Sequence, residues 1–536
     1  MVTEESHIAL RTNASSRVGL GHLYRCVELC REFKELGVKC IVVVDRISDL
    51  VRNLCGDIVS FGLYDDGDFV DENDDFIRFE KAIKGFYVSK VVVDDYRLGA
   101  DWEEKASRTG YCVCVIDDLA REHSCNLLVD QKWRGGDFSV YDGKTPDYTT
   151  KLLGPNYAIV NKKFSAVGSS KSDGFNVLIS VGGGGNAAQI EQIIASFREI
   201  SVSGMKLTVV CGPLMEDIDR LIEKQSAEDL PVELIVGETD LSSIVSRSHV
   251  FIGAAGGMMY QCVAASVPMI TFSLSENQAN RLEELADFGH YFHFSKEEID
   301  FSKIAKICVL IKENYTRVLK LVGRKTVDID CRGAERICRA ILAKEPRPEN
   351  IQVRPISRRW DNISDRHRVR PVDDADINSY LEARNRDSNR TNMSVTSVIP
   401  RTEHYLWWFN NDRCKFVVES EGVEKLYLWH EAVVFEMEKY LIGGWFSKSS
   451  SIDVFDVIAA VDWQLRTCHE EYPEVPWLAI IKRGNKFVKT LNSFFGFEEV
   501  EQETRHGNVI KQLFNVSSNQ DFHFLMGDSA LVVGQV

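Results

Sequence analysis

The sequence of 536 residues contains no apolar run close to the roughly 18 residues that a membrane-spanning helix needs. Its first residues, MVTEESHIALR, lack the basic start and the small-residue cleavage site of a secretory signal peptide. The 14 cysteines form no recurring CxxC pair at zinc-finger spacing, and no other cluster of side chains calls for a metal. We therefore expect a cytoplasmic protein with no membrane partner and no metal, whose cysteines are mostly buried, reduced thiols.

Positive charge is also scarce, since 64 Lys and Arg face 80 Asp and Glu, which gives a net charge of −16. An acidic surface does not attract a phosphate backbone, so we expect no nucleic-acid partner. A nucleotide ligand stays open, because local backbone groups can hold its phosphates. Apolar residues at 44% and charged residues at 27% exclude a disordered or fibrous chain, and the length predicts about two to four folding units.

The first part of the chain alternates apolar, β-rich runs with helical stretches. We expect strands in HIALRT, KCIVVVD, KVVVDDY, YCVCVIDD and CNLLVD. Between the first two, HLYRCVELCREFKELG has apolar residues three and four apart and ends at a glycine, which is typical of an amphipathic helix. This alternation predicts a parallel α/β domain over residues 1–165.

A second alternating series follows the small polar segment GSSKSDG (168–174). Its expected strands are FNVLISVGG, KLTVVCG, VELIVG, HVFIGAA and VPMITFS, within a domain over 172–343. In sheets of this kind ligands bind beyond the carboxyl ends of the strands, here between the two domains. We interpret 344–368 as a linker, 369–515 as a smaller α+β domain and 516–536 as a tail without a firm pattern.

The most informative segment is RTNASSRVGLGHLYRC (11–26), where a strand ends, small residues turn and a helix begins. Gly19 and Gly21 let a ligand approach the backbone, and the helix start offers unpaired N–H groups to an anion. His22 falls in the first turn, where the helix dipole opposes its protonation, and a neutral imidazole can take a proton from water. The alternative is a surface histidine beside a tight turn.

The pattern SxxxGxGHxxRC resembles the UDP-sugar hydrolases of pseudaminic acid biosynthesis, which belong to the GT-B superfamily with the lipid II-forming glycosyltransferase. The resemblance extends from residue 6 to about residue 343, and the matching residues are Ser15, Gly19, Gly21, His22, Arg25 and Cys26. It implies two Rossmann-like domains in a GT-B arrangement that hydrolyse a UDP-linked diacetamido-trideoxyhexose with inversion at the anomeric carbon, without a cofactor. His22 would be the general base, and Gly19, Gly21 and Arg25 would contact the substrate.

Two strand ends in the first domain carry adjacent aspartates. KVVVDDYRLGADWE (90–103) and IDDLAR (116–121) resemble strand-end segments of the same family, and the match places Tyr96 near the sugar and Asp118 in the substrate site. Carboxylates at strand ends can bond sugar hydroxyls or orient a histidine. The alternative is that they cap the following helices.

Two strand–helix junctions in the second domain are rich in small residues. In ISVGGGGNAAQI (179–190), glycines including Gly183 and Gly184 suit the approach of a phosphate, although a tight turn without a ligand is the alternative. FIGAAGGMMYQCVAASVPMI (251–270) resembles the GT-B nucleotide segment, which implies diphosphate contacts from Ala255, Gly256, Gly257 and Met258. The family usually has a glutamate for the ribose where this chain has Gln261, so we expect weaker or altered nucleotide binding.

The segment SLSENQANRLEELADFG (273–289) resembles the family's loop-then-helix "NQ" segment. The match implies that Asn277 reaches the sugar or the phosphates, with Gln278 beside it. The alternative is that Asn277 caps a helix that begins near Gln278.

The third domain resembles GNAT-type N-acetyltransferases over about 369–500, in RVRPVDDADINSYLEARN, TEHYLWWFNN and PWLAIIKRGNKFVKTLNSFFGFEE. The arginine- or glutamine-led glycine loop of active members is missing, and GGWFSKSSSIDVFDVIAAVDWQL (443–465) stands in its place. If acetyl-CoA binds, the resemblance implies Ser447, Ser449 and Asn485. The alternative is a degenerate domain that supports folding or dimerisation.

Three functions therefore stand as hypotheses for the whole chain. The first is a UDP-sugar hydrolase, with a possible N-acetyltransferase in the third domain. The second is a GT-B glycosyltransferase that uses the same UDP-sugar donor, and the third is a non-catalytic nucleotide-sugar-binding module. The sugar's stereochemistry and the oligomeric state stay open.

Overall fold

The computed structural model describes residues 6–15, 19–64, 68–165, 174–182, 187–200, 203–215, 217–225, 232–274, 278, 280–516 and 520–527. The chain divides into two compact units, Met1–Pro355 and Ile356–Val536. The division falls inside the range 344–368 that we interpreted as a linker. Part of that range is held against the first unit, because the Glu349 N–H donates to the Tyr157 hydroxyl at 2.7 Å and the Arg354 N–H donates to the Thr326 carbonyl at 2.7 Å.

The first unit begins with a parallel sheet in the strand order β3-β2-β1-β4-β5-β6-β7. Its strands are β1 (His7–Thr12), β2 (Lys39–Val44), β3 (Val59–Gly62), β4 (Val88–Asp94), β5 (Cys112–Ile116), β6 (Leu127–Asp130) and β7 (Thr150–Leu153). The helices are α1 (Gly21–Glu35), α2 (Asp49–Cys55), α3 (Glu72–Ile83) and α4 (Ala100–Thr109). The central strands are runs of buried Val, Ile and Leu, as expected of a parallel sheet covered on both faces. The strand order reverses between β1 and β4, which are neighbours.

A second parallel sheet has the order β10-β9-β8-β11-β12-β13, so its order reverses between β8 and β11. Its strands are β8 (Phe175–Ser180), β9 (Met205–Cys211), β10 (Val232–Val236), β11 (Val250–Ala254), β12 (Met269–Phe272) and β13 (Phe292–Phe294). The helices are α5 (Ala187–Glu199), α6 (Ile218–Gln225), α7 (Ser242–Arg247), α8 (Gly257–Ala264), α9 (Leu282–Asp287), α10 (Phe301–Glu313), α11 (Tyr315–Val322) and α12 (Gly333–Leu342). The chain thus contains two Rossmann-like parallel sheets, each with one reversal point where ligands bind in folds of this type.

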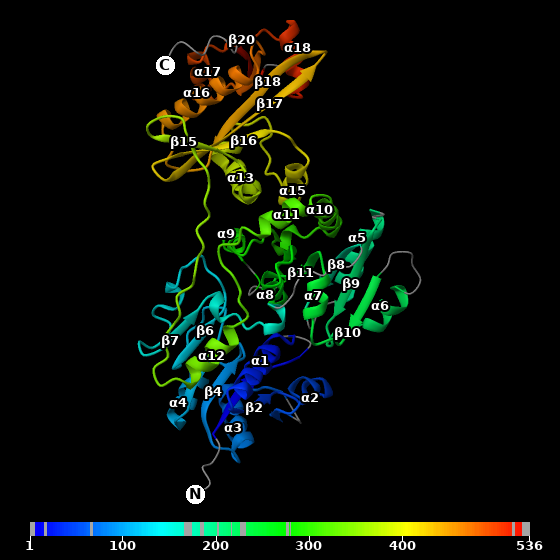
Figure 1. Ribbon diagram of the computed structural model, residues 1–536, viewed down its shortest axis with the longest axis vertical. Coiled ribbons are helices and arrows are strands. Elements are labelled where there is room, and N and C mark those ends of the chain that lie inside the picture. Colours follow the sequence, from blue (N-terminus) through cyan, green and yellow to red (C-terminus); the bar gives the residue numbers. More distant parts are fainter. Residues whose placement is uncertain are drawn as a thin grey trace. The chain divides into compact units, whose positions relative to one another are not determined.

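Helix α12 follows the second sheet but packs against α1 of the first (Figure 1). Its apolar face, with Ile337 and Cys338, joins the core around Leu29. Gly333 begins the helix against the backbone of Ala158, and a β-carbon at this glycine would lie 2.1 Å from the Ala158 carbonyl oxygen. Only glycine allows this approach, which ties the end of the second sheet's segment to the first.

The second unit contains a mixed sheet in the order β14-β15-β16-β17-β18-β19-β21-β20. Its strands are β14 (Asp361–Asn362), β15 (His367–Pro371), β16 (Cys414–Ser420), β17 (Val423–Phe435), β18 (Glu438–Ser447), β19 (Trp477–Lys482), β20 (Glu498–Glu499) and β21 (Phe522–Gly527). Its helices are α13 (Ile377–Asn385), α14 (Asp387–Arg390), α15 (Arg401–Phe409), α16 (Val454–Glu471), α17 (Lys486–Phe494) and α18 (Arg505–Leu513). Strands β18 and β19 are parallel but pair at two positions, Leu441 with Trp477 and Ile442 with Leu478. Helix α16 connects them and packs on the sheet (Figure 1).

Several details differ from the sequence predictions. The strands β3, β7 and β13 were not predicted, because their short segments VSFG, TKLL and FHF contain polar residues and form no continuous apolar run. The prediction of a patternless tail from residue 516 is wrong for 522–527, where β21 pairs with β19. Helix α9 begins at Leu282 and not near Gln278.

Two other expectations can be compared with the structure. The 14 cysteines form no disulfide in the structure, and most are buried, which confirms the prediction that they lie in the interior. Within the described ranges, no helix has both the length and the apolar character required to cross a bilayer.

Candidate active site

His22 lies at the carboxyl edge of the first sheet, in the first turn of α1. After β1, Gly19 has φ +76° and exchanges backbone hydrogen bonds with Ser15. Helix α1 then begins at Gly21, and the position that a β-carbon would take there faces open space. His22, the second residue of this helix, is 7% exposed.

Asp94 is the partner of His22 and is the last residue of β4. Because β1 and β4 are neighbouring parallel strands, with Thr12 in register with Asp94, their ends meet at the reversal point of the sheet. The His22 Nδ1 atom lies 2.6 Å from the Asp94 Oδ1 atom, and the carboxylate is fully buried. The two groups therefore form a buried histidine–aspartate pair.

Arg25, one turn after His22, binds the same carboxylate as His22. Its Nε donates to Asp94 Oδ2 at 2.9 Å and its Nη2 donates to Asp94 Oδ1 at 2.7 Å. Arg25 Nη2 also lies 2.9 Å from His22 Nδ1, because both donate to the same oxygen. A 2.6 Å contact between Nδ1 and a carboxylate requires a proton on Nδ1. In the neutral ring Nε2 then carries the lone pair, and none of the described residues hydrogen-bonds it.

The same ion pairs hold Asp94 in its charged form. Burial alone would raise the pKa of Asp94, but the charges of Arg25 and His22 and their hydrogen bonds lower it below its usual value. Burial opposes the charge of Arg25 as well, yet Asp94 and Asp118 raise its pKa well above the usual range. Arg25, predicted to contact substrate, is thus occupied by these two carboxylates.

Tyr96 and Asp118 form the other wall of this cluster. The Tyr96 hydroxyl donates to Asp118 Oδ1, and Arg25 Nη1 lies 3.4 Å from Asp118 Oδ2. The rings of Tyr96 and His22 meet edge to face, with centroids 4.5 Å apart and planes at 84°. The five side chains therefore make one contiguous group, and Tyr96 limits how the imidazole can turn.

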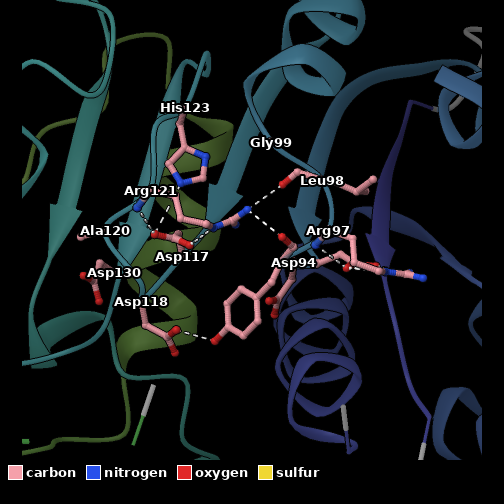
Figure 2. A network of polar contacts seen from close by, with 12 residues as sticks. Asp94, Arg97, Leu98, Gly99, Asp117, Asp118, Ala120, Arg121, His123 and Asp130 are labelled. Carbon is pink, nitrogen blue, oxygen red and sulfur yellow. Dashed lines mark hydrogen bonds and ion pairs between the residues drawn. The ribbon is translucent and has the colours of Figure 1, made fainter. Parts of the chain in front are cut away.

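A second buried network lies beside this group (Figure 2). Arg121 donates to Asp117 Oδ1 at 2.8 Å and to the carbonyls of Tyr96 and Leu98, both at 3.0 Å, so it ties the two aspartate-bearing strand ends together. The Arg121 N–H also donates to Asp117 Oδ2 at 3.1 Å, so this aspartate holds the segment after β5 and does not cap a helix, which was the alternative considered from the sequence.

His123 is the cation at the centre of this second network. Its Nδ1 lies 2.7 Å from Glu103 Oε1, and its Nε2 lies 3.5 Å from Asp117 Oδ2. Burial opposes its charge, but the hydrogen bond to Glu103 and the charges of Glu103 and Asp117 raise the pKa of His123 to about 9. Since this ring is fully buried between two carboxylates, we assign it a structural role.

Sequence reasoning missed a third group of charges at the same edge. Arg97 donates to Asp95 Oδ2 at 2.5 Å and to Asp45 Oδ2 at 2.8 Å. Arg11, on β1, donates to Asp45 Oδ1 at 2.7 Å and to Asp75 Oδ2 at 2.5 Å, although its side chain is completely buried. The only signal in the sequence is a charged residue inside the apolar run HIALRT. The Asp95 carboxylate is therefore paired with Arg97 and is not a free carboxylate at this edge.

At the reversal point of the second sheet, α8 begins without a side-chain cap. Its N-cap residue is Gly256, which has no side chain to satisfy the first N–H groups. The Ala255 N–H donates to the Phe272 carbonyl at 3.0 Å and the Gly256 N–H donates to the Ala254 carbonyl at 2.9 Å. Of the four residues predicted to meet the diphosphate, Gly257 and Met258 keep N–H groups at the open helix start.

Two amide side chains lie near this helix start. Gln261 Oε1 is buried, and no residue of the described ranges hydrogen-bonds it, so an acceptor is left for a donor such as a ribose hydroxyl. A β-carbon on Gly256 would lie 3.9 Å from the Gln278 Nε2 atom, so the structure brings these two predicted residues together. Gly183, Gly184 and Asn277 lie outside the described residues.

The two sheet edges meet through residues that follow β6. Trp133 Nε1 donates to Asp287 Oδ2 at 2.8 Å, and Trp133 shares a hydrophobic cluster with Tyr260 of α8. Burial raises the pKa of Tyr260, and the charges of Asp130 and Asp118 raise it further. Helix α8 therefore lies within electrostatic reach of Asp118, which belongs to the His22 group.

In the second unit, Ser447 and Asn485, which the resemblance implied for acetyl-CoA, have hydrogen-bond partners within the unit. The start of α16 is closed by its own acids: the Asp456 N–H donates to Asp453 Oδ1 at 2.9 Å, and the Asp453 N–H donates to Asp456 Oδ2 at 3.0 Å. Two carboxylates at this helix start repel a pyrophosphate. Ser447 Oγ donates to Asn389 Oδ1 at 2.9 Å, and Asn485 caps α17 by accepting the Val488 N–H at 3.2 Å.

A cavity of about 660 Å³ lies beside this helix start. Ser449 lines it, together with Arg386, Gly422, Val423, Glu424, Lys448 and Ser450. Of its charged lining residues, Glu424 accepts a hydrogen bond from Lys448, whereas Arg386 donates to the Lys448 carbonyl. Among the described residues no group of three or more His, Cys, Asp or Glu side chains is arranged to hold a metal ion.

Comparisons with known proteins give distant similarity over part of the chain. No protein-family model matches it. The UDP-2,4-diacetamido-2,4,6-trideoxy-beta-L-altropyranose hydrolase of Campylobacter jejuni is 18% identical over 288 residues, which are 53% of this chain and 97% of that protein. The uncharacterized protein MJ1062 of Methanocaldococcus jannaschii is 19% identical over 291 residues, which are 51% of this chain and 56% of that protein.

Two solved structures resemble the fold more loosely. MurG of Acinetobacter baumannii is 11% identical with a TM-score of 0.44, and the match covers 63% of this chain and 99% of that chain. The S. aureus MnaA structure with UDP is 12% identical with a TM-score of 0.46, and the match covers 65% of this chain and 100% of that chain.

Proposed function

We propose that the chain hydrolyses a UDP-linked diacetamido-trideoxyhexose to free sugar and UDP, with inversion at the anomeric carbon. The observation that carries the proposal is the 2.6 Å bond between His22 Nδ1 and Asp94. It leaves the lone pair of His22 on Nε2, which is the arrangement of a general base. The 18% identity to a hydrolase of this chemistry supports the choice of substrate class.

In the proposed reaction, His22 Nε2 takes a proton from a water molecule as its oxygen bonds to the anomeric carbon. The bond between that carbon and the UDP oxygen breaks on the opposite face, through an oxocarbenium-like state. Asp94 stabilises the imidazolium that forms. The proton is then released to solvent, so no group on the enzyme is consumed.

The second sheet supplies the proposed nucleotide site. N–H groups of Gly257 and Met258 at the open start of α8 would donate to the diphosphate oxygens, and the positive end of the helix dipole favours the charge of the diphosphate as it leaves. The unpartnered Gln261 Oε1 would accept a hydrogen bond from a ribose hydroxyl. This grouping supports a GT-B-type arrangement of the two sheets.

For the second unit we propose a GNAT-like domain that does not transfer acetyl groups. The support for its fold is the parallel pair β18 and β19, joined through α16 and paired at two positions. The capped start of α16 supports the loss of acetyl-CoA binding.

The experiment that tests the main proposal is an assay of UDP-linked diacetamido-trideoxyhexoses with the full chain and no added acceptor. We expect equal amounts of UDP and free sugar, and a fall in turnover of about 1,000-fold in His22→Gln, with UDP binding unchanged. Release of UDP that requires an added alcohol would indicate a glycosyltransferase. Binding of UDP without turnover of any sugar would contradict catalysis altogether.

A further inference from the structure

Four buried polar side chains, which we call the histidine network, are hydrogen-bonded in series from the core of the second sheet to Gln278. Thr271, on β12, lies 2.7 Å from His290 Nε2 and 2.8 Å from His293 Nδ1 through its Oγ1 atom. His293 Nε2 lies 3.2 Å from Ser273 Oγ, which donates to the Gln278 carbonyl at 2.9 Å. All four side chains are less than 9% exposed. The mechanism described above uses none of them.

The hydrogen bonds of the histidine network can point in only one direction when both rings are neutral. The Ser273 hydroxyl donates its one proton to the Gln278 carbonyl, so Ser273 Oγ must accept from His293 Nε2–H. His293 Nδ1 is then an acceptor and takes the Thr271 hydroxyl proton. Thr271 Oγ1 in turn accepts from His290 Nε2–H. Each link thus fixes the next.

The His290 end of the histidine network is consistent with this assignment. With its proton on Nε2, His290 has a bare acceptor at Nδ1, and Nδ1 is indeed a buried atom without a hydrogen-bond partner among the described residues. Burial lowers the pKa of His290 well below its usual value, which keeps the ring neutral. The histidine network therefore ends in one unsatisfied acceptor in the core. A buried acceptor without a partner costs folding free energy, which suggests that the network has a role at its other end.

At its other end, the histidine network holds Gln278, because Ser273 donates to the Gln278 backbone carbonyl. Besides Ser273, Asn280 Nδ2 donates to the Gln278 carbonyl at 2.7 Å, and the Leu274 N–H donates to Gln278 Oε1 at 2.8 Å. The Ser273 and Asn280 bonds hold the backbone of Gln278, and the Leu274 bond orients its side-chain amide, so Nε2 is the donor end. That donor faces Gly256, directly before the open start of α8.

We propose that Thr271, Ser273, His290 and His293 are positioning residues, which hold Gln278 so that its Nε2–H donates to the diphosphate of the bound nucleotide. The inference rests on the proposed function for its ligand. It adds a side-chain donor to the backbone N–H groups of α8, and an amide donor to a charged phosphate oxygen is stronger than one to a neutral acceptor. The donor is held in place before the nucleotide arrives.

The test is calorimetric binding of UDP to the full chain with a matched pair of variants. Thr271→Val keeps the shape of the side chain and removes the hydroxyl, whereas Thr271→Ser keeps the hydroxyl. We expect UDP affinity to fall about tenfold in Thr271→Val and to stay within about twofold of native in Thr271→Ser. Turnover at saturating sugar nucleotide should change by less than about threefold in both, while KM rises in Thr271→Val.

Gln278→Leu tests the donor itself and does not disturb the core. It should lower UDP affinity about as much as Thr271→Val, and combining the two changes should add little further loss, because both remove the same hydrogen bond. Native affinity for UDP in Thr271→Val or in Gln278→Leu would overturn the inference. So would a native chain that does not bind UDP. A chain that binds UDP with this pattern but hydrolyses no sugar nucleotide would overturn the proposed function and leave the inference standing.

Discussion

The carboxyl edges of the two parallel sheets have the same topology but opposite chemistry. At the first, between β1 and β4, charged side chains gather around His22 and Asp94. At the second, between β8 and β11, the described residues offer an uncapped helix start, the amides of Gln261 and Gln278, and neutral buried groups. A reversal point in a sheet therefore fixes where a ligand binds, whereas the side chains at the strand ends decide whether the edge catalyses or binds.

The largest effect should come from removing the charge that orients the base. In Asp94→Asn, His22 loses the partner that fixes its tautomer and stabilises its cation, so we expect turnover to fall by about 1,000-fold or more. UDP affinity should change by less than about twofold, because the second edge is untouched. Asp101→Asn, which removes an exposed carboxylate on α4, is the matched control and should be fully active. Loss of UDP binding in Asp94→Asn would contradict the assignment of catalysis to the first edge and nucleotide binding to the second.

A smaller effect should separate the buried network around His123 from the proposed catalytic group around His22. The folded chain keeps His123 charged up to pH about 9, whereas an unfolded histidine loses its proton near pH 6.5. The stability that this charge contributes is therefore complete below pH about 6.5 and is lost as the pH rises through about 9. We expect at most about 3 kcal/mol over this window.

Urea unfolding at several pH values, followed by circular dichroism, measures this contribution. The native chain should lose stability across the window, and His123→Gln should lose much less over the same range. Equal pH dependence of the two proteins would show that His123 is not charged in the folded state.

The second edge should respond to charge at the helix start. Gly257 is exposed, and its β-carbon position is open, so an added side chain meets no obstacle. Gly257→Asp should lower UDP affinity at least about tenfold, since a carboxylate repels the diphosphate and takes its N–H donors. Gly257→Ala, as the neutral control, should bind UDP within about threefold of native. Unchanged binding in Gly257→Asp would remove α8 from the nucleotide site.

No effect at all is expected from acetyl-CoA. Helix α16 in the second unit begins with a reciprocal pair of acids, Asp453 and Asp456, where α8 begins with glycine. Calorimetry of the full chain with millimolar acetyl-CoA should therefore give no binding heat. Saturable binding would contradict the interpretation of this helix start and restore an acetyltransferase role.

Much of the fold could be predicted from local pattern. Runs such as KCIVVV and KVVVDDY identify β2 and β4 because β-branched residues buried on both faces leave few other structures open. The same reasoning placed His22 at the start of a helix next to a strand end. It failed for β21, because the residues before it, from 516, show no pattern and its partner β19 is distant in sequence.

The pairings within the site could not be predicted in the same way. His22 and Asp94 are 72 residues apart and meet because β4 lies next to β1, while β2 and β3 lie on its other side. Arg25 matched a substrate-binding pattern, but two carboxylates brought by β4 and β5 occupy it. Sequence supplies the groups at each strand end, and the order of strands in the sheet decides which of them touch.

The most direct test of the central claim is hydrolysis of the sugar nucleotide in water enriched in oxygen-18. If His22 activates water against the anomeric carbon, the free sugar will carry the label at that carbon, and the released UDP will carry none. Label in the UDP phosphate, which shows cleavage of the phosphorus–oxygen bond, would contradict the account.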